Sequence, residues 1–183
     1  HVVGNIMIES IEMFRDHFHT SSVRSDLDLH DEPYVVTTIH RQENTDDVRI
    51  LDHILAVLED VSETHTLVMP LHPGTRHKIE QYGLLPRLKN VRVIDPLGYI
   101  DFMKLVLDSH GVITDSGGIQ EETTHLGIPC CTLRDNTERP VTLHRGSNKL
   151  FPLGTVDSQE LRTHLDRKDF IPKCVPLWDE QVS

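Results

Sequence analysis

Short apolar runs alternate with segments of helical periodicity along most of this chain, and this alternation restricts the fold more than any other feature. The apolar runs, each a predicted strand, lie at residues 34–39, 66–71, 91–94, 112–114 and 129–133, with a further short strand predicted at 149–153. Helices are predicted at residues 46–61, 73–83, 99–109, 118–126 and 158–167. Runs that are apolar throughout are typical of strands covered on both faces. The alternation therefore predicts an α/β fold with a doubly wound parallel sheet.

The first residues of the chain lie outside this alternation. A helix is predicted at Ile6–Phe18, and the polar stretch Thr20–Glu32 is predicted to be a linker or loop. A chain of 183 residues is long enough for one domain with a substantial core, alone or with an added arm. We therefore expect one α/β domain, preceded by a helical arm.

The charge and composition of the chain argue against several classes of protein. The chain carries 29 acidic and 18 basic side chains, a net charge of −11 at pH 7, and it has no basic run. We therefore expect neither nucleic acid nor an anionic membrane surface as a partner. No apolar run is long enough for a membrane span, and the first residues lack the features of a signal peptide. Three cysteines, two of them adjacent in a predicted buried strand (Cys130 and Cys131), show no metal-ligand spacing, so we expect a cytoplasmic protein without metal or cofactor.

The segment Gly111–Glu122, GVITDSGGIQEE, has the order of a strand, a glycine turn and the start of a helix. Two adjacent glycines let the backbone approach a ligand closely, and the first N–H groups of a helix favour an anion. Ser116 adds a hydroxyl donor, and Glu121 and Glu122 follow where a carboxylate can accept hydrogen bonds from sugar hydroxyls. The segment predicts a phosphate-and-ribose site, although it matches neither GxGxxG nor GxxxxGK[ST]. The alternative is an ordinary strand-to-helix turn whose glycines serve only its geometry.

Polar residues follow each of the first five strands of the predicted sheet. They are His40 and Arg41, His72, Asp95, Asp115 and Ser116, and Arg134 and Asp135. Because ligands of open α/β sheets bind outside the carboxyl ends of the strands, this convergence favours a ligand site over isolated caps and loop residues. Most of the 13 histidines must nevertheless be surface residues. We expect that of His17, His19, His30, His53, His65, His77, His110 and His164.

The residues after the first two strands allow more than one interpretation. His40 can serve as an acid, a base or a phosphate donor; alternatively it is a helix cap beside a surface pair of Arg41 and Glu43. Thr45 is the predicted N-cap of the helix that follows. His72 stands before a proline at a helix start, so it either contributes to a site or only ends the strand.

The loop Arg134–Pro140 is densely polar. Its two arginines, Arg134 and Arg139, can neutralise a phosphate in an otherwise acidic chain. The acidic residues of the loop could instead hold them in structural ion pairs.

Five motifs resemble those of the non-hydrolysing UDP-N-acetylglucosamine 2-epimerases, in the same order and at similar spacing. They are HRQEN (His40–Asn44), HPG (His72–Gly74), DPLGYIDF (Asp95–Phe102), TDSGGIQEE (Thr114–Glu122) and RDNTERP (Arg134–Pro140). The opening VGN and the closing PLWD at residues 176–179 resemble the hinge and the last loop of that family. The resemblance covers essentially the whole chain. It implies the C-terminal half of a GT-B-type two-domain fold, with a hinge and interdomain helix at residues 1–20 and a Rossmann-like UDP-binding domain at 33–183.

The resemblance also implies roles for individual residues. His40 would belong to the catalytic set, and His72 is a candidate for a second, regulatory substrate site. The diphosphate would lie on Ser116, Gly117 and Gly118, the ribose on Glu122 and the uracil beside Phe102. The complete set of implied UDP-binding residues is Arg41, Phe102, Ser116, Gly117, Gly118, Glu122 and Arg139.

The activity that the resemblance implies is the interconversion of UDP-GlcNAc and UDP-ManNAc in polysaccharide biosynthesis. The family eliminates UDP to give a 2-acetamidoglucal and adds it back after the C2 proton has returned on the other face. The family's acid/base carboxylates stand on a first domain that has no counterpart here, so we expect this half to bind UDP-GlcNAc or UDP but to be inactive alone, and the full-length protein to be a homodimer. Two alternatives remain: the UDP-sugar domain of a GT-B glycosyltransferase, and a nucleotide-sugar-binding protein without catalysis.

Overall fold

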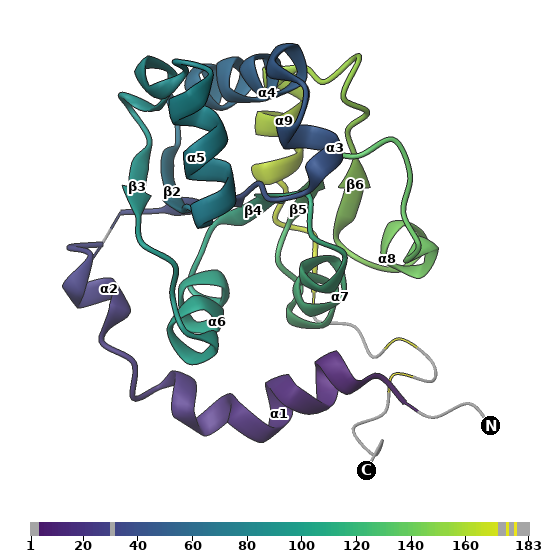
Figure 1. Cartoon of the computed structure of the whole chain (residues 1–183). Coiled ribbons are helices and arrows are strands. Elements are labelled where there is room, and N and C mark those ends of the chain that lie inside the picture. The colour runs from purple at the N-terminus through teal and green to yellow at the C-terminus, as the bar shows by residue number, and fades with distance from the viewer. Residues whose placement is uncertain (1–3, 30–31, 172–174, 176–177, 179–183) are drawn as a thin grey trace.

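The computed structural model describes residues 4–29, 32–171, 175 and 178, which are built around a parallel sheet of six strands (Figure 1). The strand order is β3-β2-β1-β4-β5-β6. The strands are β1 (Tyr34–Thr38), β2 (Thr66–Pro70), β3 (Arg92–Ile94), β4 (Gly111–Thr114), β5 (Cys130–Thr132) and β6 (Asn148–Leu150). This order is that of a doubly wound Rossmann-like sheet, so the predicted fold class is confirmed.

Helices cover both faces of this sheet. The helices α4, α5 and α9 lie on one face, whereas α6 and α7 lie on the other, with α1 outside them (Figure 1). The described helices are α1 (Ile6–Phe18), α2 (Val23–Asp26), α3 (Gln42–Thr45), α4 (Val48–Val61), α5 (Pro73–Gln81), η1 (Leu85–Leu88, a 3-10 helix), α6 (Tyr99–Leu107), α7 (Gly117–Leu126), α8 (Pro140–His144) and α9 (Ser158–Leu165).

Successive strand residues point into the two apolar cores on opposite faces of the sheet. Val35 packs in the core under α4 and α9, while its neighbour Val36 packs in the core that includes Leu105 of α6. Leu55 and Leu58 of α4 are fully buried. Burial of each such side chain contributes about 1.5–3 kcal/mol, so both helical layers are firmly attached to the sheet.

The predicted N-terminal helix is confirmed with the same bounds, and it packs against the α/β domain. Asn5 caps α1 through its Oδ1, which accepts a hydrogen bond from the N–H of Met7 at 2.9 Å. Ile8, Ile11 and Phe18 are buried in a third apolar cluster with Met103 of α6. The arm therefore adds an outer layer to the domain.

The structure differs from the sequence prediction in three connections. The predicted linker at residues 20–32 contains α2, which forms because Val23 and Leu29 are buried in the core beside α6. The short helices η1 and α8 lie where no helix was predicted, and each carries a proline in its first turn, where the absent N–H costs no helical hydrogen bond. These helices are too short to show a periodic apolar pattern.

Two assignments of single residues were wrong. Thr45 does not cap α4; it lies in α3, and Asp47 is the cap, accepting from the N–H of Arg49 at 2.8 Å. His164 is buried, its Nε2 lies 2.9 Å from the carbonyl oxygen of Ser147, and burial lowers its pKa. His17, His19, His53 and His77 are exposed, and His65 and His110 are half-buried.

The adjacent Cys130 and Cys131 are free thiols buried in β5, as the apolar run predicts. Burial raises the pKa of Cys130 to about 11, so this thiol stays protonated and inert. Cys174, His30 and most of the predicted last loop at residues 176–179 lie outside the described residues.

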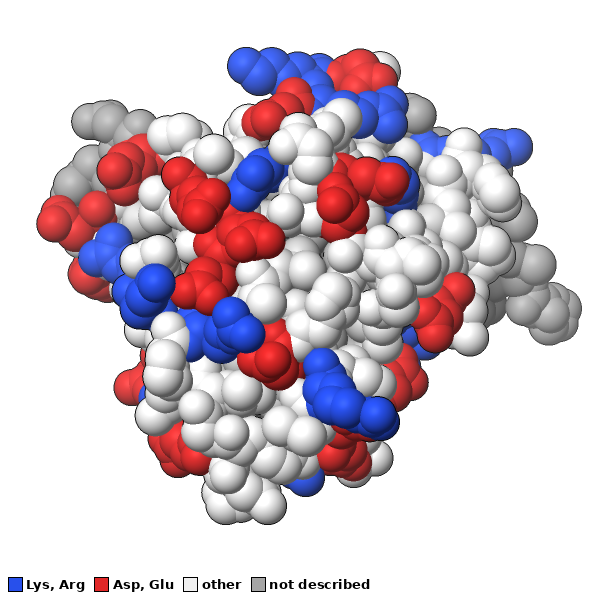
Figure 2. Space-filling model, turned by 90° about the horizontal axis from the view of Figure 1, so that it is seen from above, with Lys and Arg blue, Asp and Glu red and all other residues white. Residues whose placement is uncertain are grey.

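Acidic and basic side chains are interspersed on the outer surface of the α4 and α9 layer (Figure 2). Arg87 bonds Asp52 at 2.9 Å and Glu59 at 3.2 Å, and Lys149 bonds Glu160 at 3.0 Å. This face therefore offers no large patch of one sign. Among the described residues, no helix is both long and apolar enough to cross a membrane.

Candidate functional site

The strand order reverses direction between β1 and β4, which are neighbours in the sheet. In an open α/β sheet, the crevice outside the carboxyl ends of the strands at such a point is the usual ligand site. The two strands end side by side at Thr38 and Thr114, whose hydroxyls are 2.7 Å apart. The loops that follow carry His40 and Arg41 from β1, and Asp115 and Ser116 from β4.

Asp115, which was predicted to lie at this edge of the sheet but was given no role of its own, organises this crevice. Its side chain is fully buried and accepts hydrogen bonds from the N–H groups of His40 at 3.0 Å and Arg41 at 2.9 Å. It also accepts from Nδ2 of Asn44 at 3.1 Å, while its own carbonyl accepts from Nε of Arg41 at 2.9 Å. One carboxylate thus holds the whole turn after β1 in place. The sequence indicates such a residue, because an aspartate stands directly after an apolar strand.

His40 is oriented by the same carboxylate. Its Nδ1 lies 3.0 Å from Oδ1 of Asp115, and this hydrogen bond raises the pKa of His40 above its ordinary value, against the opposing effect of partial burial. The histidine is therefore protonated to a higher pH than a free histidine. With Nδ1 engaged, Nε2 is the ring nitrogen that can reach a ligand.

A mostly apolar pocket of about 290 Å³ adjoins His40. It is lined by Thr38, Ile39, His40, Pro70, His72, Pro96, Leu97, Phe102 and Ile119. The structure thus brings together His40 and His72, from the loops after β1 and β2, with Phe102 of helix α6. A pocket of this kind, with a few polar groups at its edge, suits a flat ring of a ligand.

His72 lies at the edge of this pocket and caps α5. Its Nδ1 accepts a hydrogen bond from the N–H of Gly74 at 3.1 Å, and Pro73 occupies the first helical position as predicted. The structure therefore places His72 beside His40 in one pocket and gives it a capping role as well.

The glycines that were predicted to bind a phosphate form the first turn of α7. Ser116 is the N-cap in an extended conformation, and Gly117 and Gly118 are the first two helical residues. The N–H groups of a first helical turn have no partner within the helix, so they are available to an anion. The side chain of Glu138 lies close to the backbone here, because a Cβ added to Gly117 would be 2.6 Å from Oε1 of Glu138.

Glu138 therefore lies where an anion would be expected. Its carboxylate bonds Arg134 at 2.8 Å and Arg41 at 3.4 Å. A hydrogen bond from its own backbone N–H, together with Arg134, holds the pKa of Glu138 below its ordinary value. Glu43 lies 3.5 Å from Nε of Arg134 and 4.0 Å from Arg41. Arg41 and Arg134 are thus held in ion pairs, and the pair of Arg134 with Glu138 is of the kind that the alternative interpretation of this loop predicts.

Arg139 is also engaged by an acidic residue. Its Nε lies 3.1 Å from Oε2 of Glu121, and Oε1 of Glu121 accepts from Nδ2 of Asn5 at 3.0 Å. Glu121 thus links α7 to the cap of α1 on one side and to the Arg134–Pro140 loop on the other. The predicted phosphate ligand Arg139 would have to leave Glu121, or share it, to bind a phosphate.

Glu122, the predicted ribose ligand, is in a different environment from its neighbour. It is 4% exposed, and within the described residues it has no hydrogen-bond or ion-pair partner for its carboxyl group. Burial, and secondarily the charge of Glu121, raises the pKa of Glu122 to about 7. A buried carboxyl group without a partner costs stability, and such groups are concentrated at functional sites.

Two of the eight residues predicted to converge at the carboxyl ends of the strands, Asp95 and Asp135, do not join the site. The side chain of Asp95 is 95% exposed and pairs with Arg76 at 3.4 Å, so it belongs to the surface beyond β3. Asp135 accepts from the N–H of Leu153 at 3.1 Å and fixes the turn after β6. The site is therefore confined to the loops after β1, β2, β4 and β5 and to the helices α6 and α7.

Known proteins with related sequences share this chain's organisation. Residues 1–168 match the family model of the UDP-N-acetylglucosamine 2-epimerases. The UDP-N-acetylglucosamine 2-epimerase of Methanococcus maripaludis is 36% identical over 159 residues, which are 82% of this chain and 43% of that protein. The Escherichia coli K12 enzyme of the same name is 34% identical over 178 residues, 91% of this chain and 46% of that protein. The chain thus spans about half the length of the relatives it matches.

Solved structures give the same result. The UDP-GlcNAc 2-epimerase of Methanocaldococcus jannaschii, solved in complex with UDP-GlcNAc and UDP, superposes with a TM-score of 0.84 at 29% identity, covering 97% of this chain and 51% of that one. A Staphylococcus aureus structure with UDP gives a TM-score of 0.72 at 26% identity, covering 91% of this chain and 46% of that one. The match of fold, motifs and sequence extends over most of the chain. The chain belongs to the UDP-N-acetylglucosamine 2-epimerase family.

Proposed function

We propose that this chain is the UDP-binding half of a UDP-GlcNAc 2-epimerase, which interconverts UDP-GlcNAc and UDP-ManNAc by elimination and re-addition of UDP. Residues 1–20 would form the hinge and interdomain helix, and residues 33–183 the nucleotide-binding domain. Support comes from the family match and from the relatives that were solved with UDP-GlcNAc or UDP. The protein would act in the cytoplasm, in polysaccharide biosynthesis.

The observation that carries this proposal is the buried carboxyl group of Glu122, in the second turn of α7, whose N-cap is Ser116 and whose first two residues are Gly117 and Gly118. A ribose offers two adjacent hydroxyl donors, which would give this carboxylate the partners that the described residues do not. The first turn of α7 would hold the diphosphate of the same nucleotide. One helix would then bind both parts of UDP.

Binding of the diphosphate requires a change in the ion pairs at the start of α7. The carboxylate of Glu138 lies against Gly117 and is held by Arg41 and Arg134. A diphosphate carries more negative charge than this carboxylate and can take both arginines as it displaces Glu138. Glu138 would thus keep the two arginines in place while the site is empty.

The apolar pocket beside His40 would take a ring of the substrate. Phe102 lines it and would lie beside the uracil, as the family resemblance implies. His72 lies on the same wall, and we assign it to a second, regulatory substrate site that would adjoin the first.

His40 would act when UDP leaves. As the bond between the sugar and the β-phosphate breaks, negative charge grows on the phosphate oxygen, and a protonated imidazole held by Asp115 can donate to it. Its raised pKa favours the protonated form of His40 that this step needs. In the reverse direction, the same nitrogen would take the proton back as UDP attacks the glycal.

The proton at C2 must be moved by other groups. We assign these acid/base carboxylates to an N-terminal domain that lies across the nucleotide cleft, and the full-length enzyme to a homodimer. The 183-residue chain would therefore bind UDP weakly and would not epimerise alone.

Two measurements test the proposal. In calorimetry, the chain should bind UDP more tightly than ATP or NAD, and equal or tighter binding of either competitor would contradict the assignment. When the chain is fused to the N-terminal half of the Methanococcus maripaludis enzyme, the fusion should convert UDP-GlcNAc to UDP-ManNAc, whereas the chain alone should not. Transfer of the sugar to an acceptor without epimerisation would indicate a glycosyltransferase instead.

A further inference from the structure

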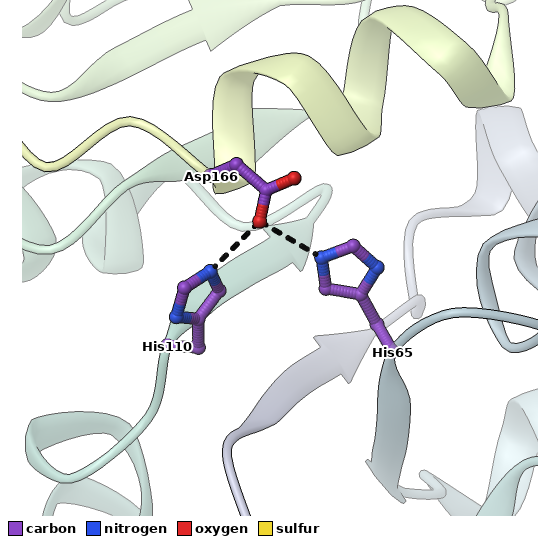
Figure 3. Close-up of side chains that lie close together, drawn as sticks. All are labelled: His65, His110 and Asp166. Carbon is purple, nitrogen blue, oxygen red and sulfur yellow. Dashed lines mark hydrogen bonds and ion pairs between the residues drawn. The ribbon is translucent and has the colours of Figure 1, made fainter.

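Two histidines and an aspartate lie close together at the amino ends of the strands, whereas the proposed nucleotide site lies at their carboxyl ends (Figure 3). His65 comes directly before β2, His110 comes directly before β4, and Asp166 is the C-cap of α9. The strands β2 and β4 flank β1, so their amino ends bring the two imidazoles to either side of one carboxylate. The sequence positions are far apart, which explains why ligand spacing along the chain gave no metal prediction.

The distances within this cluster are those of metal ligands. Nε2 of His65 lies 3.3 Å and Nε2 of His110 lies 3.2 Å from the same Oδ1 of Asp166. The three ligand atoms all lie within 4.8 Å of one another. A tetrahedral Zn²⁺ with bonds of about 2.0–2.2 Å holds neighbouring ligand atoms about 3.3–3.6 Å apart. Only small side-chain movements would therefore be needed to place an ion between the three groups.

The hydrogen bond at Nδ1 of His65 favours a cation at Nε2, the ring nitrogen that faces Asp166. Nδ1 of His65 is 2.9 Å from the hydroxyl of Thr64, which itself lies 3.4 Å from the carbonyl of Val61. If the hydroxyl donates to this carbonyl, it accepts from Nδ1–H, and the lone pair of Nε2 then faces the carboxylate of Asp166. A lone pair and a carboxylate repel each other unless a proton or a metal ion lies between them. Histidine ligands of metals usually have such an outer partner.

The surroundings leave room for the rest of a coordination shell. A pocket of about 450 Å³ adjoins the cluster, lined by Pro33, Thr64, His65, His110, Gln159, Arg162 and Asp166. The side chains of His65 and His110 are 12% and 25% exposed, whereas that of Asp166 is 61% exposed, so an ion can enter from solvent. The nearby charge of Arg162 is directed elsewhere, because its guanidinium donates to the carbonyl of Asp60 and lies 3.8 Å from Glu63.

We propose that His65, His110 and Asp166 form a Zn²⁺ site that ties the end of α9 to the amino ends of β2 and β4. Two imidazoles and one carboxylate are a ligand set that suits Zn²⁺, with water from the adjoining pocket as the fourth ligand. The site lies at the amino ends of the strands, whereas the nucleotide pocket lies at their carboxyl ends. Its role is therefore to stabilise the fold and not to contact the substrate.

Calorimetric titration of the chelator-treated 183-residue chain with Zn²⁺ tests this site. One equivalent should bind, and His65→Ala or His110→Ala should weaken binding more than about 100-fold, because loss of an outer partner alone costs about 10–100-fold. Thr64→Val should give that smaller loss. His53→Ala and His77→Ala, which remove exposed histidines from α4 and α5, are the matched controls and should leave binding unchanged.

Thermal unfolding supplies a second readout. Zn²⁺ should raise the Tm of the wild-type chain and should not raise that of the His65→Ala/His110→Ala double variant, whose fold is checked without metal by circular dichroism. Absence of Zn²⁺ binding by the wild-type chain would show that the cluster is held together by its side-chain hydrogen bonds alone. Binding that persists at similar affinity in the double variant would place the metal elsewhere. Either result overturns the proposal.

Discussion

Replacing Glu122 by glutamine should make the folded chain more stable at alkaline pH. The carboxyl group is buried, without a hydrogen-bond or ion-pair partner among the described residues, and its pKa is about 7 against an ordinary 4.5. Each unit of difference is worth about 1.4 kcal/mol. Ionising this group in the folded chain therefore costs about 3 kcal/mol more than ionising it in the unfolded chain. Glutamine has the same shape and cannot ionise, so Glu122→Gln removes this cost.

The effect must depend on pH in a defined direction. Because the folded-state pKa is raised, the folded chain binds more protons than the unfolded chain between about pH 4.5 and pH 7, so stability falls as pH rises through this window. The advantage of Glu122→Gln should therefore be less than about 1 kcal/mol at pH 5 and about 3 kcal/mol at pH 8.

Urea unfolding of both proteins at pH 5 and pH 8 measures this difference in the free energy of unfolding. Glu121→Gln, one residue away on α7, is the matched control. It should destabilise the chain at pH 8, because Glu121 bonds Arg139 and Asn5. An equal effect of Glu122→Gln at both pH values, or a loss of stability at pH 8, would refute the account of Glu122 as an unpartnered buried carboxyl group. The variant should also bind UDP more weakly, which links the cost in stability to function.

Three further outcomes are expected at the nucleotide site. In the active fusion, His40→Ala should lower kcat by about 10²–10⁴ if the histidine donates a proton to the leaving UDP, and an effect on UDP affinity alone would make it a phosphate ligand. Asp115→Asn should lower the pKa of His40, seen by NMR as titration of its ring protons at lower pH, because the hydrogen bond to the carboxylate is what raises that pKa; an unchanged titration would contradict this. Calorimetry should show that Gly117→Ala weakens UDP binding by more than tenfold, about 1.4 kcal/mol or more, because a Cβ would stand in the first turn of α7 beside Glu138. Gly98→Ala is the control: open space surrounds Gly98, so this change should leave binding unchanged. Gly83→Ala is unsuitable as a control because the φ of Gly83 is +70°.

The sheet and most of the helices could be predicted because their signals are local. Continuous apolar runs identify the central strands, and the helix Ile6–Phe18 was predicted with its observed bounds. The start of α7 could be predicted because a serine and two glycines directly after a strand are typical of a strand-to-helix turn. By contrast, α2 depends on burial of Val23 against a distant helix, which a local pattern does not report.

The interactions within the site were harder to predict because they join residues far apart in the chain. The hold of Asp115 on the turn after β1 follows from the pairing of β1 with β4. Whether an arginine is free or paired depends on which carboxylates the fold brings near, as Arg139 and Glu121 show. The proximity of His65, His110 and Asp166 could not be predicted for the same reason. The sequence around a histidine at the start of a strand does not indicate which distant residues it will contact.

The link from Asn5 through Glu121 to Arg139 has a mechanical consequence. Glu121 stands one residue before Glu122 on α7, and its two carboxylate oxygens contact Arg139 and the side-chain amide of Asn5, which caps the first helix. If Arg139 binds a phosphate, Glu121 loses one partner and its hydrogen bond with Asn5 changes. Asn5 caps α1, so in the enzyme proposed above this change would reach the residue at which the chain enters α1. In that enzyme, phosphate binding by Arg139 would be coupled through Glu121 to the position of Asn5.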